Sequence, residues 1–333
     1  MTEDKVRLGH GSGGLLTSKL IRDVILKYFD SEILKRLEDA AELPAARQKI
    51  AFTTDSYVVD PIFFPGGDIG KLAICGTIND LAVKGAIPKS LSLALIIEEG
   101  FKFSDLERIL KSAARTARAA GVNVVCGDTK VVEKGKADKL FITTSGVGII
   151  KQSISKNRIR VGDHVMLSGT IGDHGIAIMN ERLNLGLKFS VKSDVAALHG
   201  LVREILKAGP AVHFMRDPTR GGVVSVLNET LEGTRKGIVI QETALPIRKQ
   251  VRGASEILGL DPLYIANEGK LVAFVDRRRS ERILNIMRVH PLGKHAAIIG
   301  EVVNEPQGVW LRTAIGGTHP LIQMEAEGLP RIC

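Results

Sequence analysis

The chain has 333 residues, of which 44% are hydrophobic and 25% charged, the balance of a globular protein with room for two domains. Lys and Arg outnumber Asp and Glu by 46 to 37, but the basic residues are scattered and only 4% of the chain is aromatic, which argues against a base-stacking nucleic-acid surface. A modestly basic surface is better suited to small anionic ligands, such as nucleotides, or to an acidic protein partner.

The N-terminus and the cysteines indicate the compartment. Residues 1–14 lack the apolar core of a signal peptide, and no apolar run approaches the roughly 20 residues that span a bilayer. The three cysteines, Cys75, Cys126 and Cys333, are too few for a disulfide framework and have no zinc-binding spacing. We therefore expect a reduced, cytoplasmic protein that binds no membrane.

In the first half of the chain, the spacing of apolar residues predicts a mixture of helices and strands. Helices are predicted over 15–29, 69–85 and 103–121, and strands over 49–59, 90–99, 122–132 and 139–150. Ser104 is predicted to cap the third helix, because Glu107 follows three residues later as in a capping box.

The polar segment 151–163 is the predicted boundary with a second mixed half. There we predict helices over 175–181, 195–208, 219–233 and 280–289, and strands over 164–169, 237–242, 263–267, 270–276 and 296–303. Neither half has the regular strand–helix–strand repeats of a doubly wound sheet, so an α+β fold with antiparallel or mixed sheets is predicted. The domains are placed at 1–150 and 151–317, followed by an extended or mobile tail, 318–333.

Gly9, Gly11 and Gly14 match the G-x-G-x-x-G pattern of dinucleotide-binding loops. That pattern requires an apolar strand before it, and only the mixed residues KVRL stand there. A flexible loop is the simpler prediction, and a flap whose N–H groups close over phosphates is the alternative. There is no Walker A motif, so any nucleotide site must be built differently.

Several aspartates follow apolar strands or lie within an apolar helix: Asp55, Asp68, Asp80 and Asp128. An aspartate in such surroundings is unfavourable unless it is paired or bound to a cation. Carboxylates are the ligands that Mg²⁺ uses when it bridges to substrate phosphates. Asp55, Asp80 and Asp128 therefore predict a metal–nucleotide site, whereas capping or turn duty is equally plausible for Asp68 and Asp163.

Two features leave alternatives open. The segment RDPTRGGV, residues 216–223, predicts either an anion site at a helix N-terminus or a plain helix start. Cys75 and Cys126 are expected to be small core residues. Cys333, at the end of the predicted tail, is either a reactive thiol or a chance terminal cysteine.

Six segments together resemble the HypE family of hydrogenase maturation factors, from about residue 7 to residue 333. They are HGSGG, TTDSYVVDPIFFPGGDIGKLAICGTINDLAVKGA, GDTKVV, RDPTRGG, NEG and the terminal PRIC. NDLAVKGA alone would indicate only the AIR-synthetase-like ATP-binding superfamily, which includes selenophosphate synthetase and thiamine-phosphate kinase. GDTK combined with PRIC is specific to the family.

The resemblance implies two α/β domains of the AIR-synthetase (PurM)-like fold, the second an α/β sandwich, with the N-terminal sheets paired in a homodimer that holds Mg-ATP near the interface. It implies that the carbamoyltransferase HypF loads a carbamoyl group on Cys333, which ATP-dependent dehydration turns into a thiocyanate. The cyano group then passes to iron on the HypC–HypD complex for [NiFe]-hydrogenase.

Matched by motif, the resemblance also implies roles for single residues. Catalytic roles fall to Cys333, Lys130 and Glu268, nucleotide binding to Asp55, Asp68, Lys71, Asn79, Asp80, Asp128 and Thr129, and Mg²⁺ to Asp55, Asp80 and Asp128. Lys130 and Glu268 would handle the protons of the amide nitrogen. Without the resemblance, Lys130 would be an exposed lysine and Glu268 a loop carboxylate.

Two other functions remain possible from the sequence. Another superfamily enzyme, of the selenophosphate synthetase, thiamine-phosphate kinase or purine-pathway type, acts on a free small molecule and needs no terminal thiol. A non-catalytic carrier would use Cys333 without ATP turnover. An extended tail from Thr318 to Cys333 reaches up to roughly 50 Å, enough to enter a second protein's active site.

Overall fold

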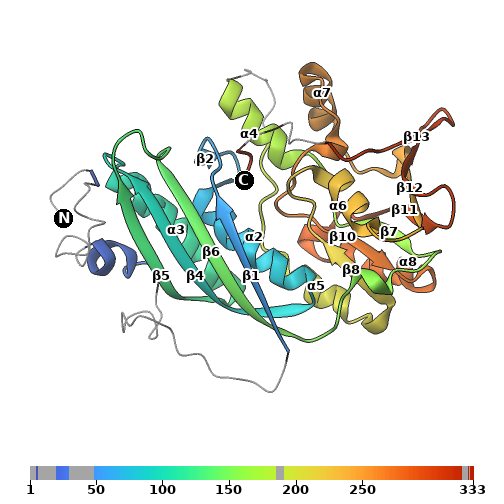
Figure 1. Cartoon of the computed structure of the whole chain (residues 1–333), viewed down its shortest axis with the longest axis horizontal. Helices are drawn as coiled ribbons and strands as arrows, with labels where there is room; N and C mark the ends of the chain where they lie inside the picture. Colours follow the sequence, from blue (N-terminus) through green and yellow to red (C-terminus); the bar gives the residue numbers. More distant parts are fainter. Residues whose placement is uncertain (1–4, 7–19, 30–48, 185–190, 325–328, 330) are drawn as a thin grey trace.

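The computed structural model describes residues 5–6, 20–29, 49–184, 191–324, 329 and 331–333, which build two large sheets side by side and a small two-stranded one, β2 (Phe63–Phe64) with β3 (Gly67–Asp68) (Figure 1). The predicted Gly9–Gly14 loop and the start of the first predicted helix lie outside the described residues. The described part of that helix is a short π-helical turn, η2 (Leu20–Ile25).

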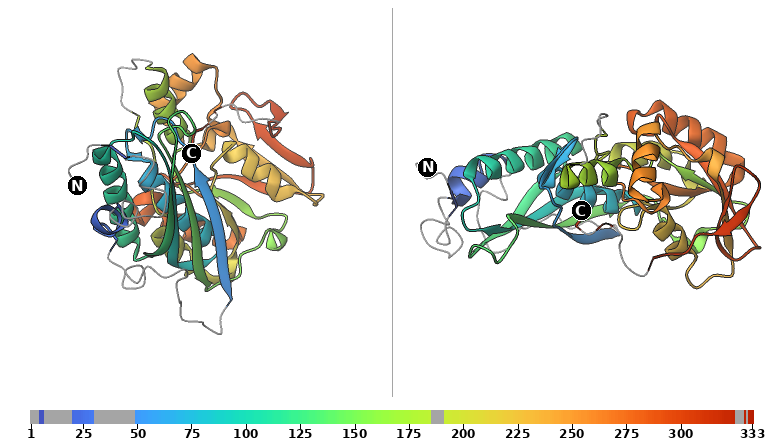
Figure 2. Two further views of the ribbon diagram at one scale, coloured as in Figure 1. Left: turned by 60° about the vertical axis from the view of Figure 1, so that its left-hand side comes forward. Right: turned by 90° about the horizontal axis from the view of Figure 1, so that it is seen from above.

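The N-terminal sheet has the strand order β1-β6-β4-β5. Its strands are β1 (Ile50–Tyr57), β4 (Ala86–Glu98), β5 (Asn123–Val132) and β6 (Leu140–Ile150). β4 and β5 run parallel and the other neighbours antiparallel, because the helix α3 (Phe103–Ala120) carries the chain back to the start of β4. Figure 2 shows α3 on one side of the sheet, and no helix of the described part of the chain covers the other side.

The helix α2 (Ile69–Val83) lies between the N-terminal sheet and the rest of the molecule. It is apolar on every side, and all but two of its residues are buried, the exceptions being Lys71 and Asp80. A helix without a polar face must be covered all round, so α2 links the core of the first sheet to the second domain. Polar residues inside such a helix need partners within the protein or a ligand.

The C-terminal sheet has the order β13-β12-β9-β11-β7-β10-β8, antiparallel except for the β12–β9 pair. Its strands are β7 (His164–Leu167), β8 (Val212–Arg216), β9 (Gly237–Gln241), β10 (Val272–Val275), β11 (Ala297–Val303), β12 (Gly308–Arg312) and β13 (Thr318–Pro320). One face packs on α6 (Gly222–Leu231), and the other on α5 (His199–Leu206) and α8 (Ser280–Val289). Helices α4 (Asp173–Leu183) and α7 (Lys249–Leu258) pack on the first core.

The α+β fold with mixed sheets is confirmed, but some local predictions are wrong. Residues 263–267 do not form a strand: Asp261 accepts the N–H of Leu263 at 2.9 Å and starts a 3-10 turn, η7 (Pro262–Tyr264). The third helix begins at Phe103 with Lys102 as N-cap and no side-chain cap, so Ser104 does not cap it. β8, β12, β13 and α7 were not predicted: the three strands have only three to five residues, too few to show a period, and the amphipathic pattern of α7 was overlooked.

The tail also differs from the mobile segment expected. Thr318–Pro320 pairs with β12 as β13, and the described terminal residues are docked against the first domain. The domain boundaries at 150 and 317 stay predictions. Among the described residues, no helix combines the length and apolarity needed to cross a membrane.

Candidate functional site

Four carboxyl groups from distant parts of the chain gather where the two domains meet. They belong to Asp55 on β1, Asp80 on α2, Asp217 after β8, and Glu268 before β10. Burial raises the pKa of Asp80 to about 6, and the nearby Asp55 carboxylate adds to the shift. Burial likewise raises the pKa of Asp217 to about 7, with Asp80 and Asp55 contributing. The site thus concentrates negative charge, which the nearby Arg216 offsets only in part.

Glu268 is the most deeply enclosed member of this carboxyl cluster. It is 2% exposed, and its Oε1 atom has no hydrogen-bond partner among the described residues. Burial, reinforced by Asp217, raises the pKa of Glu268 well above its usual value. A carboxyl group held in this way is a strong proton acceptor once it ionises, which is the property of a catalytic base.

Hydroxyl groups orient the two aspartates on β1 and α2. Thr53 donates to Asp80 Oδ2 at 2.7 Å, and both Tyr57 and Thr77 donate to Asp55 Oδ2 at 3.3 Å. Gly76 makes room for Tyr57, because a Cβ there would overlap the tyrosine hydroxyl. The hydroxyls therefore fix the direction of the carboxylates before any ligand binds.

The end of the chain docks beside this cluster, directly after β1. The N–H of Val58 donates to the carbonyl oxygen of Cys333 at 3.1 Å, and that of Asp60 to the carbonyl oxygen of Arg331 at 3.2 Å. Ile332 is 1% exposed and Cys333 is half-buried against the first core. In Figure 1 the C-terminus accordingly lies between β2 (Phe63–Phe64) and α4.

Two further side chains hold the docked tail from α4. His174 Nε2 lies 2.8 Å from the carbonyl oxygen of Ile332, and Arg182 donates to the carbonyl oxygens of Arg331 at 2.7 Å and Asp60 at 2.6 Å. Arg331 in turn forms an ion pair with Asp138. These contacts are all made with the backbone or with Arg331, so none of them uses the Cys333 side chain.

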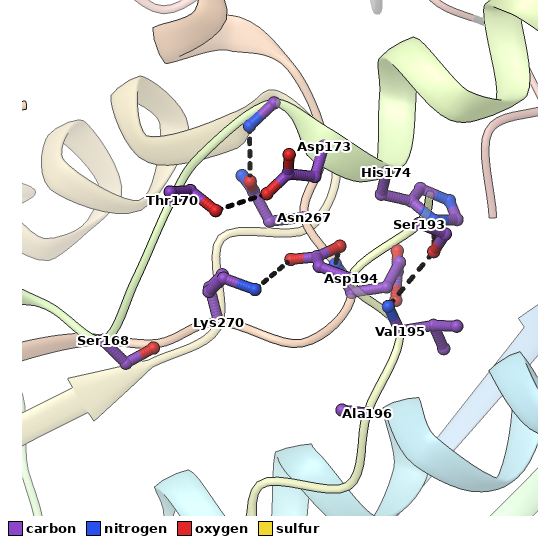
Figure 3. A network of polar contacts seen from close by, with 12 residues as sticks. Ser168, Thr170, Asp173, His174, Ser193, Asp194, Val195, Ala196, Asn267 and Lys270 are labelled. Atoms are coloured by element: carbon purple, nitrogen blue, oxygen red, sulfur yellow. Dashed lines mark hydrogen bonds and ion pairs between the residues drawn. The ribbon is translucent and has the colours of Figure 1, made fainter. Parts of the chain in front are cut away.

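The hydrogen bonds on both ring nitrogens decide the tautomer of His174, which lies next to Ser193 (Figure 3). The carbonyl oxygen of Ile332 can only accept, so Nε2 donates to it, and Nδ1 of the neutral ring accepts the hydrogen of the Ser193 hydroxyl 2.8 Å away, whose oxygen accepts the N–H of Val195 at 3.1 Å. The proton of the neutral imidazole then resides on Nε2, which donates to the tail. Burial lowers the pKa of His174 and favours this neutral form.

A buried ion pair supports the loop that carries Glu268. Lys270 Nζ lies 3.0 Å from Asp194 Oδ2, and Asp194 Oδ1 accepts the N–H of Glu268 at 3.1 Å (Figure 3). Although burial works in the opposite direction, Lys270 and His174 hold the pKa of Asp194 below its usual value. Gly269 allows this close approach, because a Cβ there would overlap the Asp194 carbonyl.

The other residues of the first domain that were predicted to bind nucleotide are engaged within the protein. Asp68 caps α2 by accepting the N–H of Lys71 at 3.0 Å, and Lys71 Nζ donates to the carbonyl of Gly66 at 2.9 Å. The amide of Asn79 donates to the carbonyl of Glu268 at 3.3 Å and accepts the N–H of Leu198 at 2.7 Å. Asn79 therefore positions Glu268, and the predicted nucleotide contacts of these residues stay predictions.

Asp128, Thr129 and Lys130 do not join the cluster within one chain. β5 is the opposite edge strand from β1, three strand spacings or about 14 Å away, and Asp128 aligns with Ser56 on the exposed face rather than with Asp55. Lys130 Nζ lies 3.5 Å from Asp128, and both side chains are exposed. Among the described residues no group of three ligands able to hold a metal is found, so a single chain does not assemble the predicted Asp55–Asp80–Asp128 set.

Sequence reasoning missed Asp217 and His174. Asp217 lies in the segment RDPTRGGV, which was considered only as an anion site at a helix N-terminus or as a plain helix start; an aspartate between an apolar strand and a proline was the overlooked signal. His174 lies in the first turn of α4, in the sequence GDHG that follows β7, where several polar residues are buried. Cys75 is buried with a pKa raised to about 12, as expected of a core cysteine, and Cys126 is half-buried.

Comparison with known proteins places the chain in a family. Residues 37–150 match the family model of the N-terminal domain of AIR synthase related proteins, and residues 160–311 match that of their C-terminal domain. Carbamoyl dehydratase HypE of Azotobacter vinelandii is 48% identical over 331 residues, covering 98% of this chain and 97% of that protein. HypE of Escherichia coli is 48% identical over 337 residues, covering 99% of this chain and 100% of that protein.

Solved structures agree with this assignment. A crystal structure of the maturation protein HypE in complex with ATP superposes with a TM-score of 0.94 at 45% identity, covering 98% of this chain and 99% of that one. HypE in a HypE–HypF complex superposes with a TM-score of 0.81 at 46% identity, covering 93% and 100%. Thiamine monophosphate kinase from Aquifex aeolicus, at 20% identity and a TM-score of 0.61, shares the fold alone. The chain belongs to the HypE family of carbamoyl dehydratases.

Proposed function

We propose that this chain dehydrates an S-carbamoyl group on its own Cys333 to a thiocyanate, with Mg-ATP as phosphoryl donor. The carbamoyl oxygen attacks the γ-phosphorus of ATP, and ADP leaves. The nitrogen then loses its two protons, the C–O bond breaks, and phosphate departs, leaving a C≡N group on sulfur. Phosphorylation is needed because an amide oxygen is a poor leaving group, and no atom is oxidised or reduced.

The docked tail is the observation that carries this proposal. The backbone of residues 331–333 is bound by Val58, Asp60, His174 and Arg182 next to the carboxyl cluster. A carrier that only delivered Cys333 to other proteins would need no binding site, here called the socket, for its own last residues. The tethered group is also present at an effective concentration on the order of millimolar, so no pocket for a free substrate is required.

Mg²⁺ bound together with ATP needs only one or two protein carboxylates besides the phosphates, and Asp55, Asp80 and Asp217 are the proposed source of them. Burial and, second to it, the neighbouring carboxylates raise the pKa of Asp80 and of Asp217, and Glu268 Oε1 lacks a hydrogen-bond partner among the described residues, so a cation would relieve this arrangement. Mg²⁺ supplies neutralisation of the transferred phosphoryl charge when it is bound. Thr53, Tyr57 and Thr77 would keep the carboxylates oriented toward it.

Glu268 is proposed to receive the proton that leaves the amide nitrogen. Its high pKa makes the ionised form a strong base, and Asn79 and Asp194 fix its backbone. A cationic Lys130 brought near it would lower that pKa and increase the ionised fraction. Since Lys130 is remote from Glu268 in one chain, this role requires a second subunit.

The exposed face of the N-terminal sheet is the proposed dimer interface. Phe52 is 68% exposed and Ile50 is 62% exposed on β1, and Ile87 and Ile96 are exposed on β4 of the same face. Between them lies a row of hydroxyls, with Ser56 Oγ 3.0 Å from Thr143 Oγ1 and Ser145 donating to Thr54 at 2.9 Å. Asp128 and Lys130 lie on this face, so pairing of two such sheets would bring these side chains next to the second subunit. Because β1 is an edge strand, the carboxyl cluster of that subunit is accessible to them.

The same reasoning extends to the partner proteins. The crystal structure of a HypE–HypF complex supports HypF as the enzyme that loads Cys333, and HypC–HypD is proposed to receive the cyano group on iron. Both exchanges require the tail to leave its socket. A thiol that must stay reduced between exchanges is consistent with the cytoplasm.

Intact-mass analysis during incubation with HypF, carbamoyl phosphate and Mg-ATP tests the reaction. The protein should gain the mass of one carbamoyl group and then lose the mass of one water. Cys333→Ala should never gain the carbamoyl mass, while the matched control Cys126→Ala should behave like the unaltered protein. Glu268→Gln should retain the carbamoyl group and dehydrate slowly. Loading without any loss of water would establish a carrier and overturn the proposal.

A further inference from the structure

A cavity of about 410 Å³ opens on the C-terminal domain, and none of the four carboxyl residues of the cluster lines it. It lies where η4 (Lys156–Arg158), η5 (Gly209–Ala211) and the start of α8 converge. Its charged and polar lining consists of Arg158, Arg160, His213, Asp276, Arg279 and Arg282. In Figure 1 the elements around it, β8 and α8, lie at the lower right, away from the C-terminus.

The charges of this arginine pocket are unbalanced. Asp276 is the one acidic residue in its lining, and its Oδ1 is engaged by the N–H of Arg278 at 2.8 Å. Arg160, Arg279 and Arg282 are exposed, and none of their guanidinium groups has an ion pair or hydrogen bond with the described residues. Gathering like charges in this way is unfavourable unless an anion is present.

Arg158 forms a rigid part of the wall. Its guanidinium donates to the carbonyl of Ser153 at 2.7 Å and to that of Pro210 at 2.9 Å. These bonds use neutral acceptors, so the positive charge of Arg158 is not cancelled. His213 is also fixed, because its Nδ1 lies 2.7 Å from Asp163 Oδ2 and both side chains are buried.

The helix α8 adds a further positive end. It spans Ser280–Val289, and its N-cap, Arg279, makes no side-chain cap hydrogen bond. Ser, Thr or Asp commonly occupies this position and satisfies the free N–H groups of the first turn. Here Arg279 stands at the cap and Arg282 follows in the first turn, while Glu281 in the same turn partly offsets their charge, and the N–H of Ser280 is already bound to the carbonyl of Arg277. The converging guanidinium groups, more than the helix end, are therefore what suits this cavity to phosphate.

We propose that the arginine pocket binds a phosphorylated small molecule about the size of a nucleoside monophosphate. The phosphate contacts Arg279, Arg282 and the start of α8. The cavity is larger than a phosphate ion alone, and Ala208, Pro210 and Ala211 form an apolar wall for the rest of the ligand. This site is separate from the dehydration chemistry, so its failure would leave that proposal untouched.

Calorimetric titration with ribose 5-phosphate tests the site, using the full-length protein saturated with Mg-ADP so that the ATP site is occupied. Ribose 5-phosphate should bind and ribose should not. Arg279→Ala and Arg282→Ala should each weaken binding by about tenfold, the effect of losing one charge-assisted contact. Arg278→Ala is the matched control. Arg278 lies beside Arg279 in the 3-10 turn η8 (Arg277–Arg279), carries the same charge, and is not part of the pocket lining.

Both test residues are exposed, so the variants should fold, and a thermal melt confirms it. Their dehydration of carbamoylated Cys333 should equal that of the unaltered protein. Equal weakening by Arg278→Ala would mean general surface attraction and would overturn the proposal. An absence of ribose 5-phosphate binding would also overturn the proposal. The same holds if only a hexa-aspartate peptide binds and its binding requires Arg279, because the pocket would then bind an acidic protein segment.

Discussion

The Nε2 atom of His174 lies 2.8 Å from the carbonyl oxygen of Ile332, the residue before the cysteine that carries the reacting group. The contact is with the backbone, so it is the same whether Cys333 bears a thiol, a carbamoyl group or a thiocyanate. Docking by this bond does not distinguish reactant from product. Release of the product therefore depends on other contacts, such as that with the partner protein.

His174→Ala removes this donor and should loosen the tail. Iodoacetamide should alkylate Cys333 about fivefold faster, since a buried hydrogen bond is worth about 1 kcal/mol. His174→Gln keeps an N–H donor and should remain close to the unaltered rate. Peptide mapping measures each cysteine separately, and Cys75, buried with a pKa of about 12, serves as the unreactive reference. Equal rates for Cys333 in all three proteins would show that His174 does not hold the tail.

Asp80→Asn should weaken Mg-ATP binding by about tenfold or more, because it removes a charged ligand. Carbamoylation of Cys333 by HypF should still occur, since Asp80 does not contact the tail. Calorimetry measures the affinity, and Asp23→Asn, a change of the same kind at an exposed site on η2, is the control. An unaltered affinity in Asp80→Asn would remove Asp80 from the metal site.

Asp217→Asn should stabilise the protein at alkaline pH in the presence of EDTA and without nucleotide. A carboxyl group with a pKa of about 7 in the folded state and about 4 when unfolded binds its proton more tightly when folded. The stability that this provides is complete below about pH 4 and is lost as the pH rises through 7. Asparagine stays neutral, so at pH 8 the Tm of the variant should exceed that of the unaltered protein. The increase should be about 2–4 °C for each kcal/mol of unfolding free energy that the ionised Asp217 removes.

The advantage of Asp217→Asn should shrink toward pH 5, where Asp217 is protonated in the folded protein. Differential scanning fluorimetry at pH 5 and pH 8 measures both. A variant that melts lower than the unaltered protein at pH 8 would show that the Asp217 carboxylate is already balanced by positive charge.

Phe52→Glu should convert a dimer to a monomer, because it places a charge in the centre of the proposed sheet interface. Val289→Glu, at an 87% exposed apolar residue on α8, is the matched control and should leave the dimer intact. Light scattering at micromolar concentration measures the mass of each. A stable, fully active monomer of the unaltered protein would contradict the proposed supply of Lys130 by a second subunit.

The local sequence pattern was sufficient to predict many of the helices and strands. α2 and β1 were predictable because both are long: α2 is a 15-residue apolar run, and β1 alternates between exposed and less exposed residues over most of its eight positions. Short elements such as β8 and β13 are different, since pairing with β10 and with β12 stabilises them more than their own residues do. The 3-10 turn at Pro262–Tyr264 was mistaken for a strand because the capping side chain of Asp261 outweighs the β-propensity of the apolar residues after it.

The sequence by itself determined the family, through motifs such as GDTK and PRIC, and the chemical types of residue that the reaction needs. Only the tertiary structure decided which of them meet. Asp55 and Asp80 come together with Asp217 and Glu268, while Asp128 lies on the other face and at the other edge of the sheet. The reason is geometric: alternation along a strand and the order of strands in a sheet place side chains, and both depend on pairings between distant segments that local residues do not encode.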